Sequence, residues 1–246
     1  MSKDLFSKIT FSAKAIGTTL LVFFLSQIVV GIVIATLLGL MGNSSTQIEE
    51  KLENSNSMLL LLTFAVAAAV IFLIVRLLRW KKQPVFSFLT LDRKPQMKQI
   101  GQVFVVYGAY FVSLVMVTVV IGTFTSVNIE QQQELGLEQV RSSFELFQVF
   151  LMLAIIPPIY EEILFRGFLY RTLRKRLSVI VAGLLTCVLF GVAHLEYNNL
   201  NWIAAIDTFI FSAFLIYLVE KQKHLYGAML LHALKNSLAF YVLFVR

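Results

Sequence analysis

Long apolar runs, separated by short polar segments, occupy most of the chain. A helix that crosses a bilayer needs about 20 mainly apolar residues. Seven segments meet or approach that length, and we expect each to be a transmembrane helix: Ala15–Met41, Met58–Leu78, Gly101–Thr123, Phe144–Phe168, Val179–Leu195, Trp202–Val219 and Tyr226–Phe244. The pattern therefore predicts an all-α fold, a polytopic membrane bundle of about seven transmembrane helices.

The segment Arg79–Ile100 interrupts this pattern, because it is basic and contains Pro84 and Pro95. We expect it to lie at the membrane surface as an amphipathic linker. Residues 1–143 would then hold the N-terminal membrane helices and the linker, and residues 144–246 the helices that carry the chemistry. No internal repeat divides the chain, so the two parts should form a single integrated membrane domain.

Composition agrees with the pattern, since 58% of the residues are hydrophobic and only 14% are charged. An ordinary soluble domain is about 45–50% apolar and about 25% charged. Lipid must therefore be the solvent for most of the chain. The single cysteine, Cys187, excludes an intrachain disulfide, and its apolar neighbours indicate a small buried hydrophobic residue.

The net charge of +7 comes from basic residues at the ends of the apolar runs rather than along one polar face. Nucleic acid is therefore not an expected partner. With the N-terminus inside, most of the 21 Lys and Arg residues lie in cytoplasmic segments, while Glu130, Glu134 and Glu138 lie on the opposite side. The bias predicts a multi-pass plasma-membrane protein with a cytoplasmic N-terminus. Nothing in the sequence resembles a eukaryotic targeting signal, so we expect a bacterial protein.

Three charged residues lie inside the fourth apolar run, namely Glu161, Glu162 and Arg166. A charge at the bilayer centre costs at least about 2.5–3.5 kcal/mol on insertion scales, so its default interpretation is functional. Glu162 and Arg166 are four residues apart and can pair on one helix face. Glu161 is rotated by about 100° from Glu162 and should face another partner. Pro157 and Pro158, just before this group, free backbone carbonyls there.

The depth of these residues in the membrane can be compared by counting along the helices. The chain reverses near Leu177, and Glu161 and His194 lie almost equally far from that turn on its two sides. Measured from Arg171, Glu161 lies about 15 Å inward. The sequence therefore predicts that Glu161 and His194 lie at one depth.

The last apolar run contributes to the same level. Measured from Lys223, His232 lies about 14 Å inward, and Asn236 shares its helix face four residues later. A carboxylate beside a neutral imidazole can take a proton from water, here Glu161 with His194. A second histidine and an amide, His232 and Asn236, can donate hydrogen bonds to an oxyanion. The grouping predicts a hydrolytic site.

Three motifs in this part of the chain resemble those of the CPBP family of intramembrane endopeptidases, which includes the type II CAAX prenyl proteases and the bacterial Abi proteins. EEILFR at 161–166 matches EExxxR, FGVAH at 190–194 matches FxxxH, and HALKN at 232–236 matches HxxxN. The resemblance covers roughly Phe144–Phe244. It implies catalytic roles for Glu161, His194, His232 and Asn236, with Glu162 and Arg166 in support.

The resemblance also implies a reaction and a substrate class. The expected activity is hydrolysis of a peptide bond in a membrane-associated peptide or protein, for peptide maturation, signalling or bacteriocin self-immunity. A glutamate-dependent mechanism without a cofactor is favoured, because no H-E-x-x-H helix is present. The alternative is zinc on Glu161, His194 and His232 with one open position. A non-catalytic binding or immunity protein, or a small transporter whose polar cluster binds a ligand, is the alternative from another class.

Three polar residues of the membrane region lie outside the motifs. Counting from the helix ends places Asp207 and Lys235 at similar depths, about 18–20 Å inward, so we expect them to pair. His224 follows Lys221-Gln222-Lys223 in a short turn. For His224 we expect only contact with solvent or lipid headgroups.

Overall fold

The computed structural model describes residues 3–124, 140, 142–195 and 202–246, and the described residues form helices without strands. The all-α polytopic membrane fold is therefore confirmed. Six helical segments are long and apolar enough to cross a bilayer: Lys3–Leu40, Asn56–Trp80, Met97–Phe124, Ser143–Leu173, Trp202–Gln222 and Tyr226–Phe244. The remaining predicted span is helix α9 (Val179–Ala193), which has 15 residues and is shorter than a typical span.

Helix boundaries differ from the prediction mainly where polar residues join an apolar helix. Helix α1 (Lys3–Leu40) begins twelve residues before Ala15 and has 38 residues. Helix α2 (Ser45–Asn54) was not predicted, because it has no apolar run; a capping box between Ser44 and Gln47 starts it. The predicted surface linker is shorter, because α3 (Asn56–Trp80) and α5 (Met97–Phe124) extend into it around the short α4 (Val85–Phe88).

Many large apolar side chains of these helices are exposed, for example Val105 at 73% and Ile180 at 72%. A monomeric soluble protein rarely exposes so much contiguous apolar surface. Acyl chains would cover these side chains in a bilayer. The protein is a multi-pass membrane protein. Its orientation stays a prediction. Glu130, Glu134 and Glu138, on which that prediction partly rests, lie outside the described residues.

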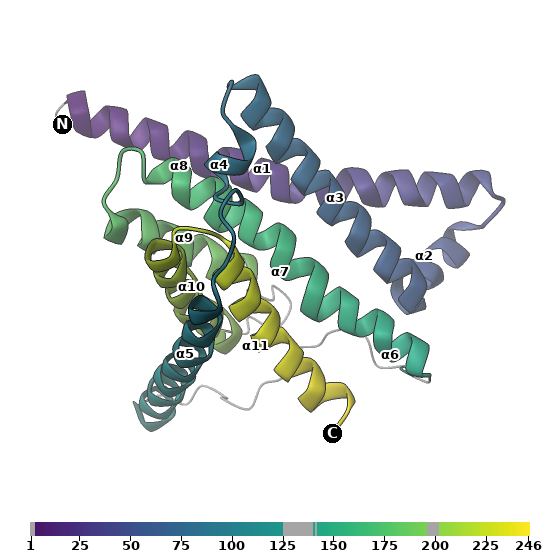
Figure 1. Ribbon diagram of the computed structural model, residues 1–246. Coiled ribbons are helices and arrows are strands. Elements are labelled where there is room, and N and C mark those ends of the chain that lie inside the picture. Colours follow the sequence, from purple (N-terminus) through teal and green to yellow (C-terminus); the bar gives the residue numbers. More distant parts are fainter. Residues whose placement is uncertain (1–2, 125–139, 141, 196–201) are drawn as a thin grey trace. The chain divides into compact units, whose positions relative to one another are not determined.

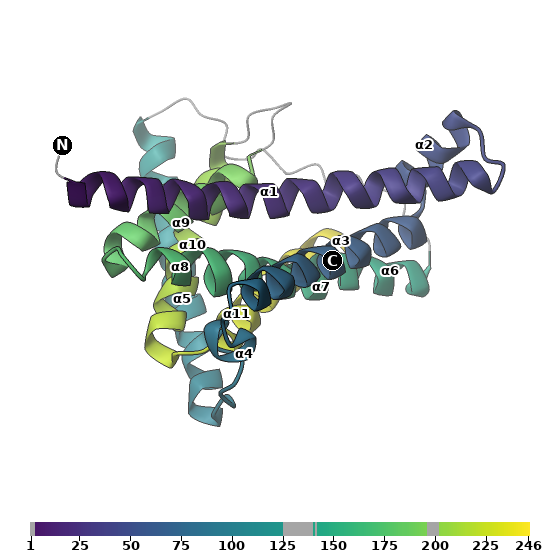
Figure 2. The same ribbon diagram turned by 90° about the horizontal axis from the view of Figure 1, so that it is seen from above.

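Contacts divide the described chain into two compact units. The first consists of residues from 1–85, 135–164 and 232–246. One continuous segment of this unit consists of α6 (Ser143–Phe150), the π-helix η1 (Leu151–Ile155) and α7 (Ile156–Glu161). Helix α3 packs against this segment and against α1, as Figures 1 and 2 show. Val149, Met152 and Phe240 form a buried cluster. This cluster holds the end of α11 (Tyr226–Phe244) against α6 and η1.

The second unit consists of residues from 86–134 and 165–231. Helix α10 (Trp202–Gln222) packs against α5 and α9, and the aromatic ring of Tyr110 lies 5.0 Å from that of Phe211. At Gly191 the backbones of α9 and α10 approach closely, since an added Cβ would lie 2.8 Å from the carbonyl oxygen of Ala205. A second π-helix, η2 (Glu162–Tyr170), continues into α8 (Arg171–Leu173).

Candidate active site

The helix that carries the EEILFR motif departs from α geometry on both sides of Glu161. The π-helix η1 precedes α7, and η2 begins at Glu162. π-Helical turns are rare and occur frequently at functional sites. Pro157 and Pro158 lie at the first positions of α7 and lack a backbone N–H. Glu161 and Glu162 therefore lie at the junction of an α-helical and a π-helical segment.

The two prolines explain the position of Asn236. In an α-helix the carbonyl of Leu153 would accept from the N–H of residue 157, and in a π-helix from that of residue 158. Both residues are proline and cannot donate. Instead, Asn236 Nδ2 donates to the Leu153 carbonyl oxygen at 2.9 Å. The amide has a second N–H, so one donor can still serve another acceptor.

His232 lies between the two consecutive glutamates. Its Nδ1 is 2.9 Å from Glu162 Oε1, and its Nε2 is 3.9 Å from Glu161 Oε2. All three side chains are buried: Glu162 has 0% exposure, His232 4% and Glu161 8%. With Nδ1–H donating to the Glu162 carboxylate, the opposite nitrogen points toward Glu161. Glu162 thus has His232 as a partner, and its expected pair with Arg166 remains a prediction.

Arg166 and His194 belong to the second unit and contact the same aromatic ring there. The guanidinium carbon of Arg166 lies 4.1 Å from the centroid of Phe190, and the His194 ring lies 4.5 Å from it. Arg166 Nη2 also donates to Ser212 Oγ at 2.7 Å. His194 follows the last residue of α9, and its Nδ1 lies 2.8 Å from the carbonyl oxygen of Phe190. Donation from Nδ1 leaves the lone pair of His194 Nε2 for a proton.

The structure brings together Glu161, Glu162 and His232 in the first unit, where Asn236 binds the Leu153 carbonyl. In the second unit, Arg166 and His194 contact Phe190. The expected common depth of Glu161 and His194 remains a prediction. Two partners were missed from the sequence, the Leu153 carbonyl and the Ser212 hydroxyl. Pro157 and Pro158 indicate that a backbone carbonyl one turn earlier lacks its helical donor. A single serine in an apolar run, such as Ser212, does not indicate which residue it will bind.

Asp207 has a partner that the sequence did not reveal. It accepts a hydrogen bond from the hydroxyl of Tyr110, which lies 97 residues earlier on α5. The tyrosine satisfies a carboxylate inside the membrane region without a second charge. The expected pair between Asp207 and Lys235 remains a prediction.

The prediction for His224 was wrong, because its side chain is buried with 2% exposure. Its Nε2 lies 3.0 Å from Gln99 Oε1, and the nearby Gln222 Nε2 donates to the Gln99 carbonyl oxygen at 3.0 Å. Lys223, with a φ of 60°, turns the chain between α10 and α11. Burial lowers the pKa of His224, and the positive charge of Arg93 lowers it further. The short turn therefore folds the histidine inward, against α5.

The alternative mechanism would need Glu161, His194 and His232 as zinc ligands. Among the described residues, no three His, Cys, Asp or Glu side chains converge closely enough to hold a metal ion. His232 Nδ1 is bound to Glu162, as is usual for a histidine whose other nitrogen takes part in ligation or acid–base chemistry.

One comparison with known proteins matches the part of the chain that carries the three motifs. Residues 143–238 match the family described as type II CAAX prenyl endopeptidase Rce1-like. The match spans all three motifs, so the resemblance expected from them is confirmed. No curated protein and no solved structure matches the chain.

Proposed function

We propose that this protein is an intramembrane protease in which Glu161 activates the hydrolytic water, because residues 143–238 match the Rce1-like type II CAAX endopeptidase family. The substrate is a membrane-associated peptide or protein, since the candidate residues lie in helices that are exposed to lipid. Support for the mechanism comes mainly from one observation, the position of His232 between two buried glutamates.

The separation of Glu161 and His232 is compatible with a tetrahedral intermediate that contacts both side chains. Their facing atoms are 3.9 Å apart, which is too long for a direct hydrogen bond. A water on Glu161 and a carbonyl oxygen on His232 can therefore become neighbouring oxygens of one tetrahedral carbon. Glu162 fixes the imidazole ring, so that Nε2 rather than Nδ1 faces the reacting group.

In the proposed reaction, the water oxygen attacks the scissile carbonyl carbon while the Glu161 carboxylate takes its proton. The carbonyl oxygen becomes an oxyanion, which accepts hydrogen bonds from protonated His232 Nε2 and from the remaining N–H of Asn236. As the C–N bond breaks, the leaving nitrogen takes the proton from Glu161. From the family motifs alone, we assign to His194 a supporting role in proton transfer through Nε2, and Arg166 would orient Phe190 and His194 within their own unit.

The decisive variant is Glu161→Gln, which keeps the side-chain shape and removes the base. We expect cleavage to fall by about 10²–10⁴-fold, the usual contribution of general acid–base catalysis. Membrane peptides from cells that produce the wild type or the variant would be compared by mass spectrometry. Products present with the wild type should be absent with Glu161→Gln at an equal protein level.

Glu53→Gln is the matched control, because Glu53 is an exposed glutamate of α2 outside the site. It should give the wild-type peptide pattern. If Glu161→Gln also gave that pattern at normal membrane levels, the enzyme proposal would be wrong and a binding or transport function would be preferred. Metal analysis of the purified protein tests the proposed metal-free mechanism separately, since stoichiometric zinc would contradict it.

A further inference from the structure

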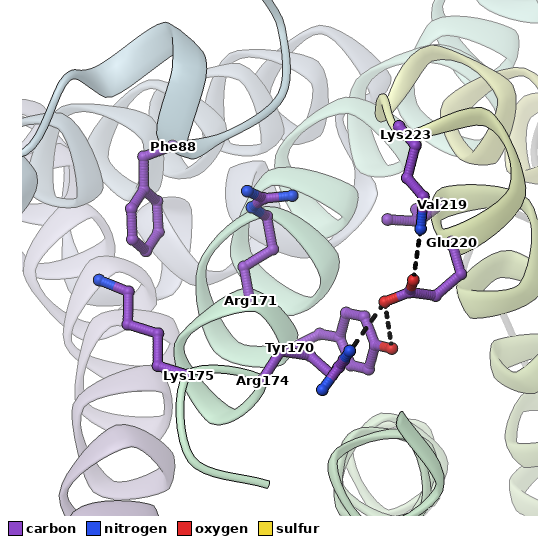
Figure 3. A pocket seen from close by; sticks show the side chains of 8 residues that line it. All are labelled: Phe88, Tyr170, Arg171, Arg174, Lys175, Val219, Glu220 and Lys223. Carbon is purple, nitrogen blue, oxygen red and sulfur yellow. Dashed lines mark hydrogen bonds and ion pairs between the residues drawn. The ribbon is translucent and has the colours of Figure 1, made fainter. Parts of the chain in front are cut away.

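A basic cavity of about 290 Å³ lies in the second unit, where the helix of η2 and α8 ends beside the end of α10. Figure 3 shows the residues that line it: Phe88, Tyr170, Arg171, Arg174, Lys175, Val219, Glu220 and Lys223. None of them belongs to the three motifs. Four are cations and one is an anion, so the lining carries a formal charge of +3.

Glu220 organises one side of this cavity. It accepts a hydrogen bond from the Tyr170 hydroxyl at 2.8 Å and ion-pairs with Arg174 at 3.3 Å and Lys223 at 2.8 Å. In Figure 3, dashed lines join the Glu220 carboxylate to these three side chains. Arg174 also donates to the carbonyl oxygen of Leu177. A single carboxylate thus fixes two of the four cations and leaves the lining positive.

Arg171 is on the other side of the cavity and has a different environment. Its guanidinium points into the space between Phe88 and Lys223 in Figure 3. Its Nε is buried and has no hydrogen-bond partner among the described residues. A guanidinium presents its N–H groups as a planar fork that matches a phosphate or carboxylate. Lys175 lies nearby, with its Nζ 4.6 Å from the centroid of the Phe88 ring.

The cavity lies at the ends of two apolar helical segments, Ser143–Leu173 and Trp202–Gln222. Lipid phosphates lie at this level of a bilayer, and basic pockets between helix ends bind anionic headgroups. Phe88 and Val219 supply apolar surface beside the cations. We propose that this cavity binds the phosphate group of an anionic phospholipid headgroup, with Arg171 as its principal ligand.

The dimensions favour a headgroup over a larger ligand. A volume of about 290 Å³ is at the lower limit of small-molecule sites and suits a phosphate with its glycerol rather than a folded partner. The acyl chains of a lipid remain outside the cavity, along the exposed apolar helices. A free phosphate ion has the same chemistry and is distinguished by experiment.

The test measures thermal unfolding of the full-length protein in detergent micelles. Dioleoylphosphatidylglycerol, which is anionic, would be titrated against dioleoylphosphatidylcholine, and inorganic phosphate would be titrated alone. A ligand that binds only the folded state raises the Tm. We expect a larger rise with phosphatidylglycerol than with phosphatidylcholine, and we expect Arg171→Gln to weaken this effect by about tenfold in lipid concentration.

Arg176→Gln is the matched control, since Arg176 is an exposed arginine of the same segment that does not line the cavity. It should retain the wild-type titration. Equal effects of the two lipids, or equal losses in both variants, would overturn the proposal. If inorganic phosphate gave the whole effect and the lipid added nothing, the ligand would be free phosphate and the lipid assignment would be wrong. If Arg171→Gln does not fold, Lys175→Gln takes its place, and its Tm titration is compared with those of the wild type and Arg176→Gln.

Discussion

At the scale of single residues, the partners of the buried and half-buried polar groups come from distant parts of the chain. Asp207 is paired with Tyr110 and Asn236 with Leu153, at separations of 97 and 83 residues. Local spacing suggested Glu162 with Arg166, whereas the structure gives Glu162 a contact with His232. Helical spacing predicts which residues share a face, but it carries no information about which neighbouring helix that face meets.

His224 provides a prediction for pH, because it lies between α10 and α11, outside the membrane-spanning segments. Its pKa in the folded protein is below the value of about 6.5 in an unfolded chain. The unfolded chain therefore binds more protons as the pH falls below that value, and folding loses stability. We expect a lower Tm at about pH 5.5 than at about pH 7.5.

His224→Gln should reduce this difference in Tm, because glutamine can donate to Gln99 but does not titrate in this range. Thermal unfolding in detergent at the two pH values would measure it. An equal drop in Tm for the wild type and the variant would assign the pH dependence to other groups.

At the scale of helices, Gly191 fixes how closely α9 approaches α10. An added methyl group would lie 2.8 Å from the Ala205 carbonyl oxygen and 3.3 Å from Phe209 Cβ. Gly191→Ala must therefore separate the two helices, and we expect a loss of about 1–3 kcal/mol of stability. His194 ends the same helix, so peptide cleavage should fall as well.

Gly183→Ala is the control for this prediction, since an added methyl at Gly183 on the same helix would meet only Ile216, at 4.0 Å. Thermal unfolding should distinguish the two variants. Equal Tm values for Gly191→Ala and Gly183→Ala would show that the close approach is not required.

The helices themselves were largely predictable, and their irregularities were not. A helix that crosses lipid needs about 20 mainly apolar residues, and such a run is easy to recognise in a sequence. The span Tyr226–Phe244 was predicted with its observed bounds. Helix α2 has no such run. The π-helical segments 151–155 and 162–170 depend on a shift of one residue in backbone hydrogen bonding, which leaves the apolar composition unchanged.

At the scale of the whole molecule, the distribution of basic residues predicts an orientation that cysteine labelling can test. The chain has one cysteine, Cys187, so Cys187→Ala gives a background without thiols. In that background we expect an impermeant maleimide to label Glu53→Cys on intact cells. It should label Asp92→Cys only after the membrane is opened, because the predicted orientation places the basic linker in the cytoplasm. The reverse pattern would contradict the predicted orientation.

The bond between Asn236 and the Leu153 carbonyl also sets an order for biosynthesis. A ribosome adds Leu153 to the chain 83 residues before it reaches Asn236. His232, the partner of Glu161 and Glu162, is likewise made about 70 residues after them. A nascent chain therefore holds its glutamates in the membrane before it can complete the site. The proposed active site would become competent only after α11, which carries His232 and Asn236, has been inserted.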